Sequence, residues 1–454
     1  MKVPLLDKFW QLINKYASIL FFVILIITII DRNNRWKDWD EPNGPFEYDV
    51  SEYYCYLPYY LLDNNTTTSN IEMQYGKRTL GLPIMYSPFF ALGHLHAKLN
   101  NTLADGYSKS YQNWIHFGTI VYVLLGLFFI RNILLRHFNE IITALTLLSL
   151  IFGTNLFYYT FSFGEMPHSY LFFLYSFFLF SFFKWLDIRK KRFLYGAAFC
   201  LGLITLIRVP DIIIVIIPLL YNIKSLSELL NRIRKIYIHK NIFYNSVLFF
   251  LIPLVIQLVY WKIHFGHWLH NQYPDEHFYF LDPQFINFLF SFRKGWFIYT
   301  PIMIFSAVGL ITLYCKQKEY FWLVFIFLIL NIYILSSWWD WGYGGSFGSR
   351  AMIQSYSLLA IPISSIFNQI WHLNKPFVKW LMRLILIICI CFFCYLNFFQ
   401  SKQFKYNIIH WNGMTKQAYF YIIKDYTDTK QQRDSLAKLF NEPNVVLMKK
   451  GLRD

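Results

Sequence analysis

The sequence predicts an all-α membrane protein with about eleven transmembrane helices, on three observations. The 454 residues are 56% hydrophobic and only 15% charged, whereas about a quarter of the residues in soluble domains are charged. The apolar residues fall in blocks of roughly twenty residues, the length of a helix that crosses a bilayer. The basic residues gather in short loops between these blocks. Lipid is therefore the expected solvent, and nucleic acid is not an expected partner despite the net charge of +16.

Eleven apolar blocks are the expected spans. They cover approximately residues 16–31, 113–135, 141–160, 168–184, 193–208, 211–223, 244–262, 297–315, 320–337, 351–371 and 380–398. No small-residue cleavage site follows the first block, so we interpret it as an uncleaved span with the N-terminus in the cytoplasm. Arg208-Val-Pro-Asp211 separates the fifth and sixth blocks, which form either two spans joined by a tight outer turn or one broken helix.

The charges of the loops test this topology. The loops 184–192 and 224–240 each carry five Lys or Arg residues and one acid, and both fall on the predicted cytoplasmic side, as the positive-inside rule requires. The stretch 31–60 has seven acids and three bases and falls outside. Eleven spans also place the tail 399–454 outside, although its many lysines do not favour that side.

The domain organisation follows from these spans. Residues 1–398 form one transmembrane module, and residues 399–454 form a short extracytoplasmic tail. The outer loop 32–112 is large, and within it residues 80–98 are apolar but interrupted by Pro83 and Pro88. We expect an amphipathic helix there that lies at the membrane surface.

Five unusual polar stretches all fall on the predicted outer face, where an active site could form. They are residues 47–54, 164–168, 208–211, 291–296 and 338–350. The inner loops are basic but contain no comparable motif.

Two of these stretches supply acids. Asp49 and Glu52 follow the first span, where a carboxylate could deprotonate an attacking hydroxyl or hold a divalent cation; the alternative is a solvated acidic loop. Glu165 and His168 lie between two apolar blocks, as a second carboxylate and a metal or acceptor ligand. Their structural alternatives are a helix cap and a histidine bonded to a carbonyl group.

The other three stretches supply cations. Arg208 either pairs locally with Asp211 or faces a lipid phosphate. Arg293 and Lys294 are either interface anchors or phosphate ligands. In the stretch 338–350, close-spaced glycines allow backbone N–H groups to approach an anion, and the guanidinium of Arg350 suits phosphate. The alternative is a re-entrant turn with an anchoring arginine and tryptophans of an interfacial belt.

The order of these motifs resembles that of a known family. An Asp-x-x-x-Tyr-Tyr stretch (Asp49, Tyr53, Tyr54) follows the first helix. An acid in the second outer loop, an Arg-x-Pro turn and a Trp-rich Gly-Ser-Phe-Gly-x-Arg loop come later. Residues 16–400 resemble the GT-C superfamily of integral membrane glycosyltransferases, which includes protein mannosyltransferases and the lipid A aminoarabinose transferase. The chain looks closest to bacterial members with the Trp-rich loop.

The resemblance implies an enzyme of the bacterial inner membrane. Such enzymes move a sugar from a polyprenyl-phosphate donor to an acceptor (lipid, glycan or protein) on the periplasmic or outer face. Asp49 would be the catalytic base, Glu165 the acid of the second loop and Arg350 a contact to the donor phosphate. Many members have two adjacent acids in the first loop, whereas Glu52 lies three residues after Asp49.

We therefore expect three groups of site residues. The candidate catalytic residues are Asp49, Glu52 and Glu165. The candidate phosphate ligands are Arg350, Arg208, Arg293 and Lys294. The candidate sugar or acceptor contacts are Tyr53, Tyr54, His168, Trp339, Asp340 and Ser346. No cofactor is certain, but a divalent cation (Mg, Mn or Zn) on Asp49, Glu165 and His168 is possible.

Two other classes of function stay open at this point. A flippase for lipid-linked sugars or another multi-helix transporter would also have many helices and buried charges. However, transporters often show repeated halves and sites near the midplane, and the sequence shows neither. A polymerase or ligase of envelope glycans usually has a long outer loop late in the chain, and here the long loop comes first.

Overall fold

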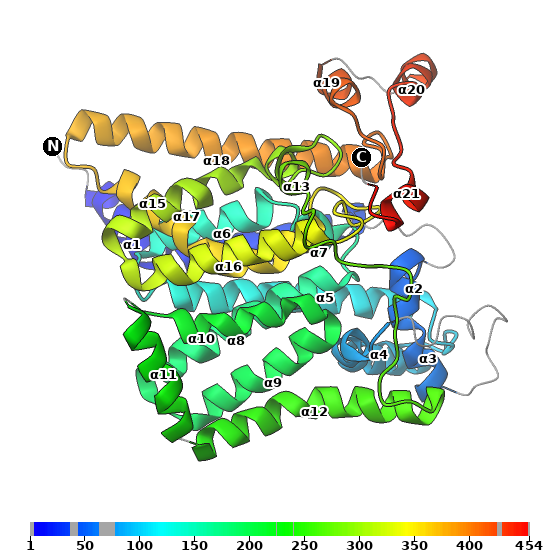
Figure 1. Ribbon diagram of the computed structural model, residues 1–454. Coiled ribbons are helices and arrows are strands. Elements are labelled where there is room, and N and C mark those ends of the chain that lie inside the picture. Colours follow the sequence, from blue (N-terminus) through cyan, green and yellow to red (C-terminus); the bar gives the residue numbers. More distant parts are fainter. Residues whose placement is uncertain are drawn as a thin grey trace. The chain divides into compact units, whose positions relative to one another are not determined.

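The computed structural model describes residues 4–36, 44–62, 78–223, 225–238, 240–424 and 429–452. Every regular element in these ranges is a helix, which confirms the prediction of an all-α protein. Figure 1 draws these helices along the chain, which divides into two compact units. Unit 1 comprises residues 1–35, 130–158 and 275–454, and unit 2 comprises residues 36–129 and 159–274.

Unit 2 carries the helices that follow the first apolar block. They are α2 (Tyr48–Tyr54), α3 (Tyr56–Leu61), α4 (Gly81–Leu99), most of α5 (Lys109–Leu134), α8 (Pro167–Ile188), α9 (Lys191–Ile207), η2 (Val209–Val215), α10 (Ile216–Leu220), α11 (Leu226–Ile238) and α12 (Lys240–Phe265). The helix expected at residues 80–98 is present as α4, and its location at a membrane surface stays a prediction.

Unit 1 carries the first helix and the second half of the chain. Its elements are α1 (Pro4–Trp36), α6 (Glu140–Phe152), the start of α7 (Tyr158–Phe161), α13 (Phe285–Phe290), α14 (Trp296–Tyr299), η3 (Pro301–Met303), α15 (Ile304–Lys316), α16 (Lys318–Ser337), η4 (Arg350–Ser355), α17 (Tyr356–Trp371), α18 (Pro376–Lys405), α19 (Lys416–Lys424), α20 (Lys430–Ala437) and α21 (Val445–Lys449).

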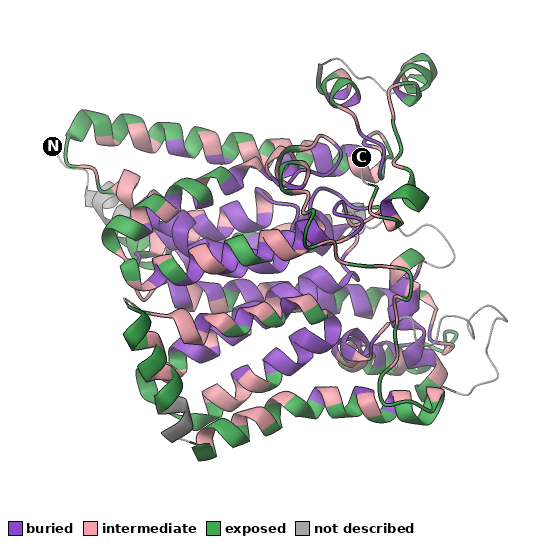
Figure 2. Cartoon of the chain, in the orientation of Figure 1, coloured by how far each residue is buried: buried purple, intermediate pink, exposed green. Residues whose placement is uncertain are grey.

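All eleven apolar blocks coincide with helical segments. Among the described residues, five helices are long and apolar enough to cross a membrane: α5, α8, α12, α16 and α18. In the most apolar stretches of α12 and α18 only 11% of the residues are buried, and both helices are mostly exposed or half-buried in Figure 2. Long apolar helices that are this exposed fit contact with lipid rather than water. The number of eleven spans stays a prediction.

The turn between the fifth and sixth blocks joins two separate segments. Helix α9 ends at Ile207, and the backbone of Arg208 is extended, with φ −146° and ψ 108°. The 3-10 helix η2 then packs back against α9. Proline at the second position of η2 fits this arrangement, because proline is tolerated in a first turn but not inside a helix.

One glycine in each unit lets two helices approach closely. A Cβ atom on Gly202 of α9 would lie 2.2 Å from the carbonyl oxygen of Phe250 in α12. A Cβ atom on Gly309 of α15 would lie 2.1 Å from the carbonyl oxygen of Pro362 in α17. Small residues at such crossings are typical of helices that pack in membranes.

Candidate functional site

The two expected acids of the first loop lie on one face of α2 in unit 2. Asp49 and Glu52 are three residues apart, a spacing that places side chains next to each other on a helix. The guanidinium of Arg78 contacts both: its Nη2 lies 3.2 Å from Asp49 Oδ1, and its Nε donates to Glu52 Oε2 at 2.7 Å. The side chains of Arg78 and Glu52 are 14% and 11% exposed, and that of Asp49 is 36% exposed. Asp49 is thus the more accessible of the two acids.

Two tyrosines complete the surroundings of Arg78. The guanidinium carbon lies 5.1 Å from the ring centre of Tyr53 and 5.6 Å from that of Tyr273, and Nη1 donates to the hydroxyl of Tyr273. Each guanidinium nitrogen therefore has a partner. Burial lowers the pKa of Arg78, but Tyr53, Tyr273, Asp49 and Glu52 together raise it above its ordinary value, so this residue remains a fixed positive charge.

The neighbouring Tyr54 has a packing role. It is fully buried, its ring stacks on Phe46 with centres 3.6 Å apart, and its hydroxyl donates to the carbonyl oxygen of Gly106. The hydroxyl of Tyr56 donates to the carbonyl oxygen of Arg78 at 2.5 Å. These contacts fix α2 and the backbone of Arg78, so that the acids and the guanidinium are held in place.

Glu165 is fully buried in unit 2 and pairs with a histidine that the sequence analysis did not select. Its Oε1 lies 2.9 Å from Nδ1 of His116, which is also buried. No described group within hydrogen-bonding distance meets the other carboxylate oxygen, Oε2. His168 is buried in the first turn of α8, with its ring 6.0 Å from that of Tyr159. Nearby, Thr119 donates to the carbonyl oxygen of Gly164 at 3.1 Å.

Arg208 forms the local pair that was the alternative to a phosphate contact. Its Nη1 lies 3.8 Å from Asp211 Oδ2. Asp211 is buried, and its Oδ1 also accepts from the hydroxyl of Tyr175 at 3.1 Å. A role of Arg208 toward phosphate stays a prediction.

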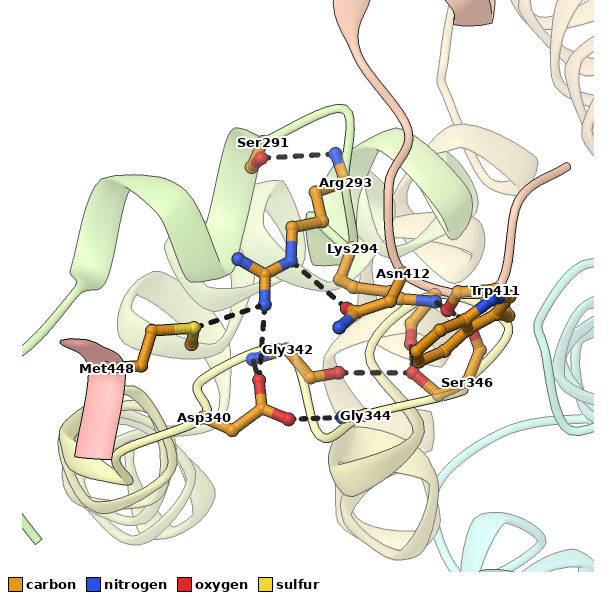
Figure 3. Close-up of polar contacts among 11 residues, drawn as sticks. Ser291, Arg293, Lys294, Asp340, Gly342, Gly344, Ser346, Trp411, Asn412 and Met448 are labelled. Atoms are coloured by element: carbon orange, nitrogen blue, oxygen red, sulfur yellow. Dashed lines mark hydrogen bonds and ion pairs between the residues drawn. The ribbon is translucent and has the colours of Figure 1, made fainter. Parts of the chain in front are cut away.

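In unit 1, the Trp-rich loop folds around the carboxylate of Asp340 (Figure 3). Asp340 Oδ1 accepts from the backbone N–H of Gly342 at 3.2 Å, and Oδ2 accepts from that of Gly344 at 2.6 Å. Gly344 has φ +63°, a conformation that glycine adopts without strain. Two of the backbone N–H groups expected to approach a bound anion are therefore occupied by the protein's own carboxylate.

Arg293 and Lys294 lie beside this loop and also contact the tail (Figure 3). Arg293 Nη2 lies 3.4 Å from Asp340 Oδ1, and its Nε donates to Asn412 Oδ1 at 3.2 Å. The ammonium group of Lys294 donates to the carbonyl oxygens of Ser346 and Trp411. The tail is thus part of the surroundings of both cations, and its predicted side of the membrane remains to be tested.

The electrostatic environment of Lys294 is positive. Burial is the largest cause that lowers the pKa of Lys294, and the charges of Arg293 and Arg350 lower it further, whereas Asp340 raises it. Arg350, at the start of η4, therefore lies within electrostatic range of Lys294. Arg293 contacts the carboxylate of Asp340, and Arg350 lies near enough to Lys294 to act on its charge. The positive charge of two arginines around this one acid favours an anion. We name Arg293, Lys294, Arg350 and Asp340 the cationic loop cluster.

Two of the expected sugar or acceptor contacts in this loop have partners within the protein. The indole N–H of Trp339 donates to Glu276 Oε2 at 2.9 Å, and the ammonium group of Lys449 lies 5.3 Å from the ring centre of Trp339. The hydroxyl of Ser346 bonds to the carbonyl oxygens of Gly342 and Gly348 at 3.1 and 3.0 Å. These contacts stabilise the loop, and a contact to sugar stays a prediction.

The expected residues thus gather in two places. In unit 2, Asp49, Glu52, Tyr53 and Tyr273 meet around Arg78, and we name these five residues the acidic cluster. The contacts described for Glu165, His168 and Arg208 are with other residues. In unit 1, Arg293, Lys294, Asp340 and Ser346 meet around the Trp-rich loop.

The three expected ligands of a divalent cation are not gathered in one place. Within the described ranges, no group of three or more His, Cys, Asp and Glu side chains is placed to hold a metal ion. The guanidinium of Arg78 lies on Asp49, and His116 lies on Glu165. A divalent cation stays a prediction.

Sequence reasoning missed four partners of the expected site residues. Arg78 contacts Glu52 and Asp49, which lie 26 and 29 residues before it. Tyr273 contacts the guanidinium of Arg78, 195 residues before it. His116 lies 49 residues before Glu165, and Asn412 lies 119 residues after Arg293. The one available signal was a polar side chain, Arg78 or His116, next to an apolar segment, and this signal does not specify a partner.

No family model and no curated protein matches the sequence. Among solved structures, the chain is similar to the archaeal oligosaccharyltransferase AglB from Archaeoglobus fulgidus, solved in complex with an inhibitory peptide and a dolichol-phosphate. The identity is 12% and the TM-score 0.41, over 81% of this chain and 52% of that structure. The chain thus spans about half the length of that structure. A likeness at this level does not establish function, which is argued below from the residues of the chain.

Proposed function

We propose that the protein is a membrane glycosyltransferase that moves a sugar from a polyprenyl-phosphate donor to an acceptor hydroxyl at the membrane surface. The observation that carries the proposal is the carboxylate of Asp49. It is 36% exposed, held by Arg78, and belongs to a chain with five membrane-length helices. Such helices suit a lipid donor, because the prenyl chain can stay in the bilayer while its head group reaches water.

The reaction needs a base for the acceptor. The acceptor oxygen attacks the anomeric carbon, and its proton passes to the carboxylate of Asp49. The bond between the anomeric carbon and the phosphate oxygen breaks, and polyprenyl phosphate leaves with the bonding electrons. Atoms and charge balance with no further reactant.

The leaving group gathers negative charge and needs cations. The cationic loop cluster is the candidate, because it holds two arginines and one carboxylate. Arg350 is the proposed contact to the donor phosphate, because a guanidinium fork matches the phosphate oxygens. Arg293 and Lys294 add positive potential, although Asp340, Asn412 and backbone carbonyl groups already engage them. Charge stabilisation of this kind is commonly the largest contribution to catalysis.

Arg78 is a positioning residue in this proposal. Its bonds to both acids and to Tyr273 fix the direction of the carboxylates. Glu52 is more buried than Asp49 and takes the shorter bond, so we assign it to holding Arg78 and not to proton transfer. Glu165 is fully buried against His116, and its proposed role is structural support of the site and not direct contact with the acceptor.

Release of polyprenyl phosphate tests the proposal. The full chain in lipid nanodiscs is incubated with a panel of polyprenyl-phosphate sugars and a membrane extract as acceptor. We expect release with at least one donor, which Asp49→Asn abolishes. Glu47→Gln is the matched control, because Glu47 precedes α2 and its side chain makes no capping bond; it should keep wild-type activity. No release from any donor by folded protein would contradict the proposal and favour a flippase for lipid-linked sugars.

A further inference from the structure

One end of unit 2 is basic, and it lies opposite the acidic cluster. Near the starts of α9 and α12, Asn245 donates to the hydroxyl of Tyr195 at 3.2 Å. Near their other ends, Thr79 and Leu80 bond to Leu206 and Gln257 at 2.6 and 2.7 Å. Helices α9 and α12 therefore run in the same direction. Because Thr79 directly follows Arg78, the acidic cluster lies near the second ends of these helices, away from Tyr195 and Asn245. Helix α12 has 26 residues, about 39 Å at 1.5 Å per residue, which is long enough to cross a bilayer.

Helix α11 lies at the basic end. It follows α10 and precedes α12, contacts both, and in Figure 1 it crosses the ends of α9 and α12 at a steep angle. Arg232 ties it to the end of α10: Nη1 donates to the carbonyl oxygens of Pro218, Leu219 and Tyr221 at 3.1, 3.2 and 2.5 Å. A cation that binds terminal carbonyl groups stabilises a helix end, so the rotation of α11 about its axis is fixed.

That rotation leaves an apolar face of α11 uncovered by the protein. Leu226, Leu230 and Ile233 are 72%, 59% and 51% exposed. Their spacing of four and three residues places them on one side of the helix. Ser227, Glu228 and Asn231 are also exposed, on the other side, and the exposed Arg234, four residues after Leu230, borders the apolar face. A helix with one exposed apolar face and one polar face is suited to the boundary between lipid tails and headgroups.

The surroundings of α11 are positively charged. The exposed bases at this end are Lys184, Arg189, Lys190, Lys191, Arg192, Arg234 and Lys240. The exposed acids in the same segments are Asp187 and Glu228. Arg189 packs over the ring of Trp185 at 5.1 Å, which holds its guanidinium at the end of α8. Bases that cluster beside an amphipathic helix attract anionic lipids at about 1 kcal/mol for each charge.

We propose that α11 and the turn 184–192 form a binding surface for anionic phospholipid headgroups. The apolar face of α11 would enter the bilayer boundary, and the bases would contact the phosphates of the leaflet opposite the acidic cluster. The complementary charge and the exposed apolar side chains on one fixed helix favour a lipid surface over a soluble partner. This proposal does not depend on the proposed transfer reaction.

Lipid retention tests the proposal. The full chain is purified in detergent that contains equal amounts of phosphatidylglycerol and phosphatidylcholine, and the retained lipids are counted by native mass spectrometry. Wild type should retain phosphatidylglycerol preferentially. The double variant Arg189→Gln with Arg234→Gln should lose this preference, by about five-fold for each charge. The matched control is Lys98→Gln with Lys109→Gln, which removes the same charge at the other end of unit 2 and should retain the wild-type ratio.

A second pair of variants tests the apolar face. Leu230→Asn should lower the retention of phosphatidylglycerol without a change of charge, whereas Asn231→Gln, on the polar face of α11, should not. Thermal unfolding in lipid-free detergent shows that each variant folds. The proposal would be overturned by equal retention of both lipids on wild type, by an equal loss in the lysine control, or by a wild-type ratio for Leu230→Asn.

Discussion

The acidic cluster of unit 2 and the cationic loop cluster of unit 1 both contain arginine–carboxylate ion pairs, but the ratio of arginines to carboxylates differs. In the acidic cluster one arginine serves two carboxylates, and one of these is partly exposed. In the cationic loop cluster a single carboxylate contacts Arg293, and Lys294 and Arg350 lie nearby. The first arrangement has more carboxylates than arginines, and the second has more arginines than carboxylates. The balance of charges around an arginine, more than the presence of an arginine, therefore indicates what a site can bind.

The largest expected effect separates the two acids of the acidic cluster. Asp49→Asn keeps the shape of the side chain but removes the proton acceptor, so kcat for sugar transfer should fall by about 10² to 10⁴. Glu52→Gln should reduce kcat much less, because Glu52 holds Arg78. Steady-state kinetics on the donor found in the release assay measure both. Equal losses would show that the two carboxylates act as one unit and would remove the special role of Asp49.

The cationic loop cluster should affect the donor more than the acceptor. Arg350→Gln removes a charged hydrogen bond to phosphate worth about 1.5–3 kcal/mol, so KM for the donor should rise by about 10-fold to 100-fold. Arg350→Lys should lie between wild type and Gln, since lysine keeps the charge but lacks the fork. Lys438→Gln, an exposed charge in the same unit, is the control. An unchanged KM for the donor would argue against phosphate at this loop.

Arg78 should matter for stability as well as for activity. Lysine cannot bond to two carboxylates and a tyrosine hydroxyl in the geometry of a guanidinium, so Arg78→Lys should lower the free energy of unfolding by about 2 kcal/mol. Arg78→Ala should cost about 3 kcal/mol, because the mostly buried Glu52 then loses its partner. Thermal unfolding in detergent compares the variants. A fully stable Arg78→Ala would mean that the acids do not need the cation.

The smallest expected effect is a difference in pH dependence between the two clusters. Burial and neighbouring cations lower the pKa of Lys294 below its ordinary 10.5. Between the folded-state pKa and 10.5 the unfolded chain binds more protons, so stability should rise with pH across that window. Lys294→Met should remove this part of the slope of Tm against pH. Arg78→Lys is the control, because it should leave the contribution of Lys294 to the slope of Tm against pH unchanged. Identical slopes for wild type and Lys294→Met would contradict the prediction.

Much of the helical architecture could be read from the sequence because its signals are local. Each apolar block contains helix, although the blocks 141–160, 211–223, 297–315 and 351–371 are divided between two or more helical segments. The proline-interrupted segment 80–98 forms α4. The turn Arg208–Asp211 separates α9 from η2, where proline and two charges interrupt an apolar run. The number of membrane crossings is harder to obtain, since helices such as α6 and α15 have 13 residues each, fewer than the roughly 20 that a simple span needs.

The site could be predicted only in part, since chemistry depends on partners that are distant in sequence. The types and order of the residues pointed to Asp49, Glu52 and the Trp-rich loop. Spacing favoured His168 as the neighbour of Glu165, but the tertiary structure brings His116 instead. Likewise, the glycines at 342 and 344 were expected to present N–H groups to a ligand, and the nearest anion in the fold is Asp340. A pattern of donors does not reveal that the chain itself supplies the acceptor.

The bonds between Asp340 and the glycine N–H groups have a consequence for conformational entropy. Glycines are the residues that lose most freedom when a loop becomes ordered. In this loop the carboxylate restrains them before any ligand arrives, so binding would not have to meet that entropic cost. Replacement of Asp340 by alanine would remove this restraint. The loop would then lose conformational entropy when a ligand binds, and the ligand would bind more weakly.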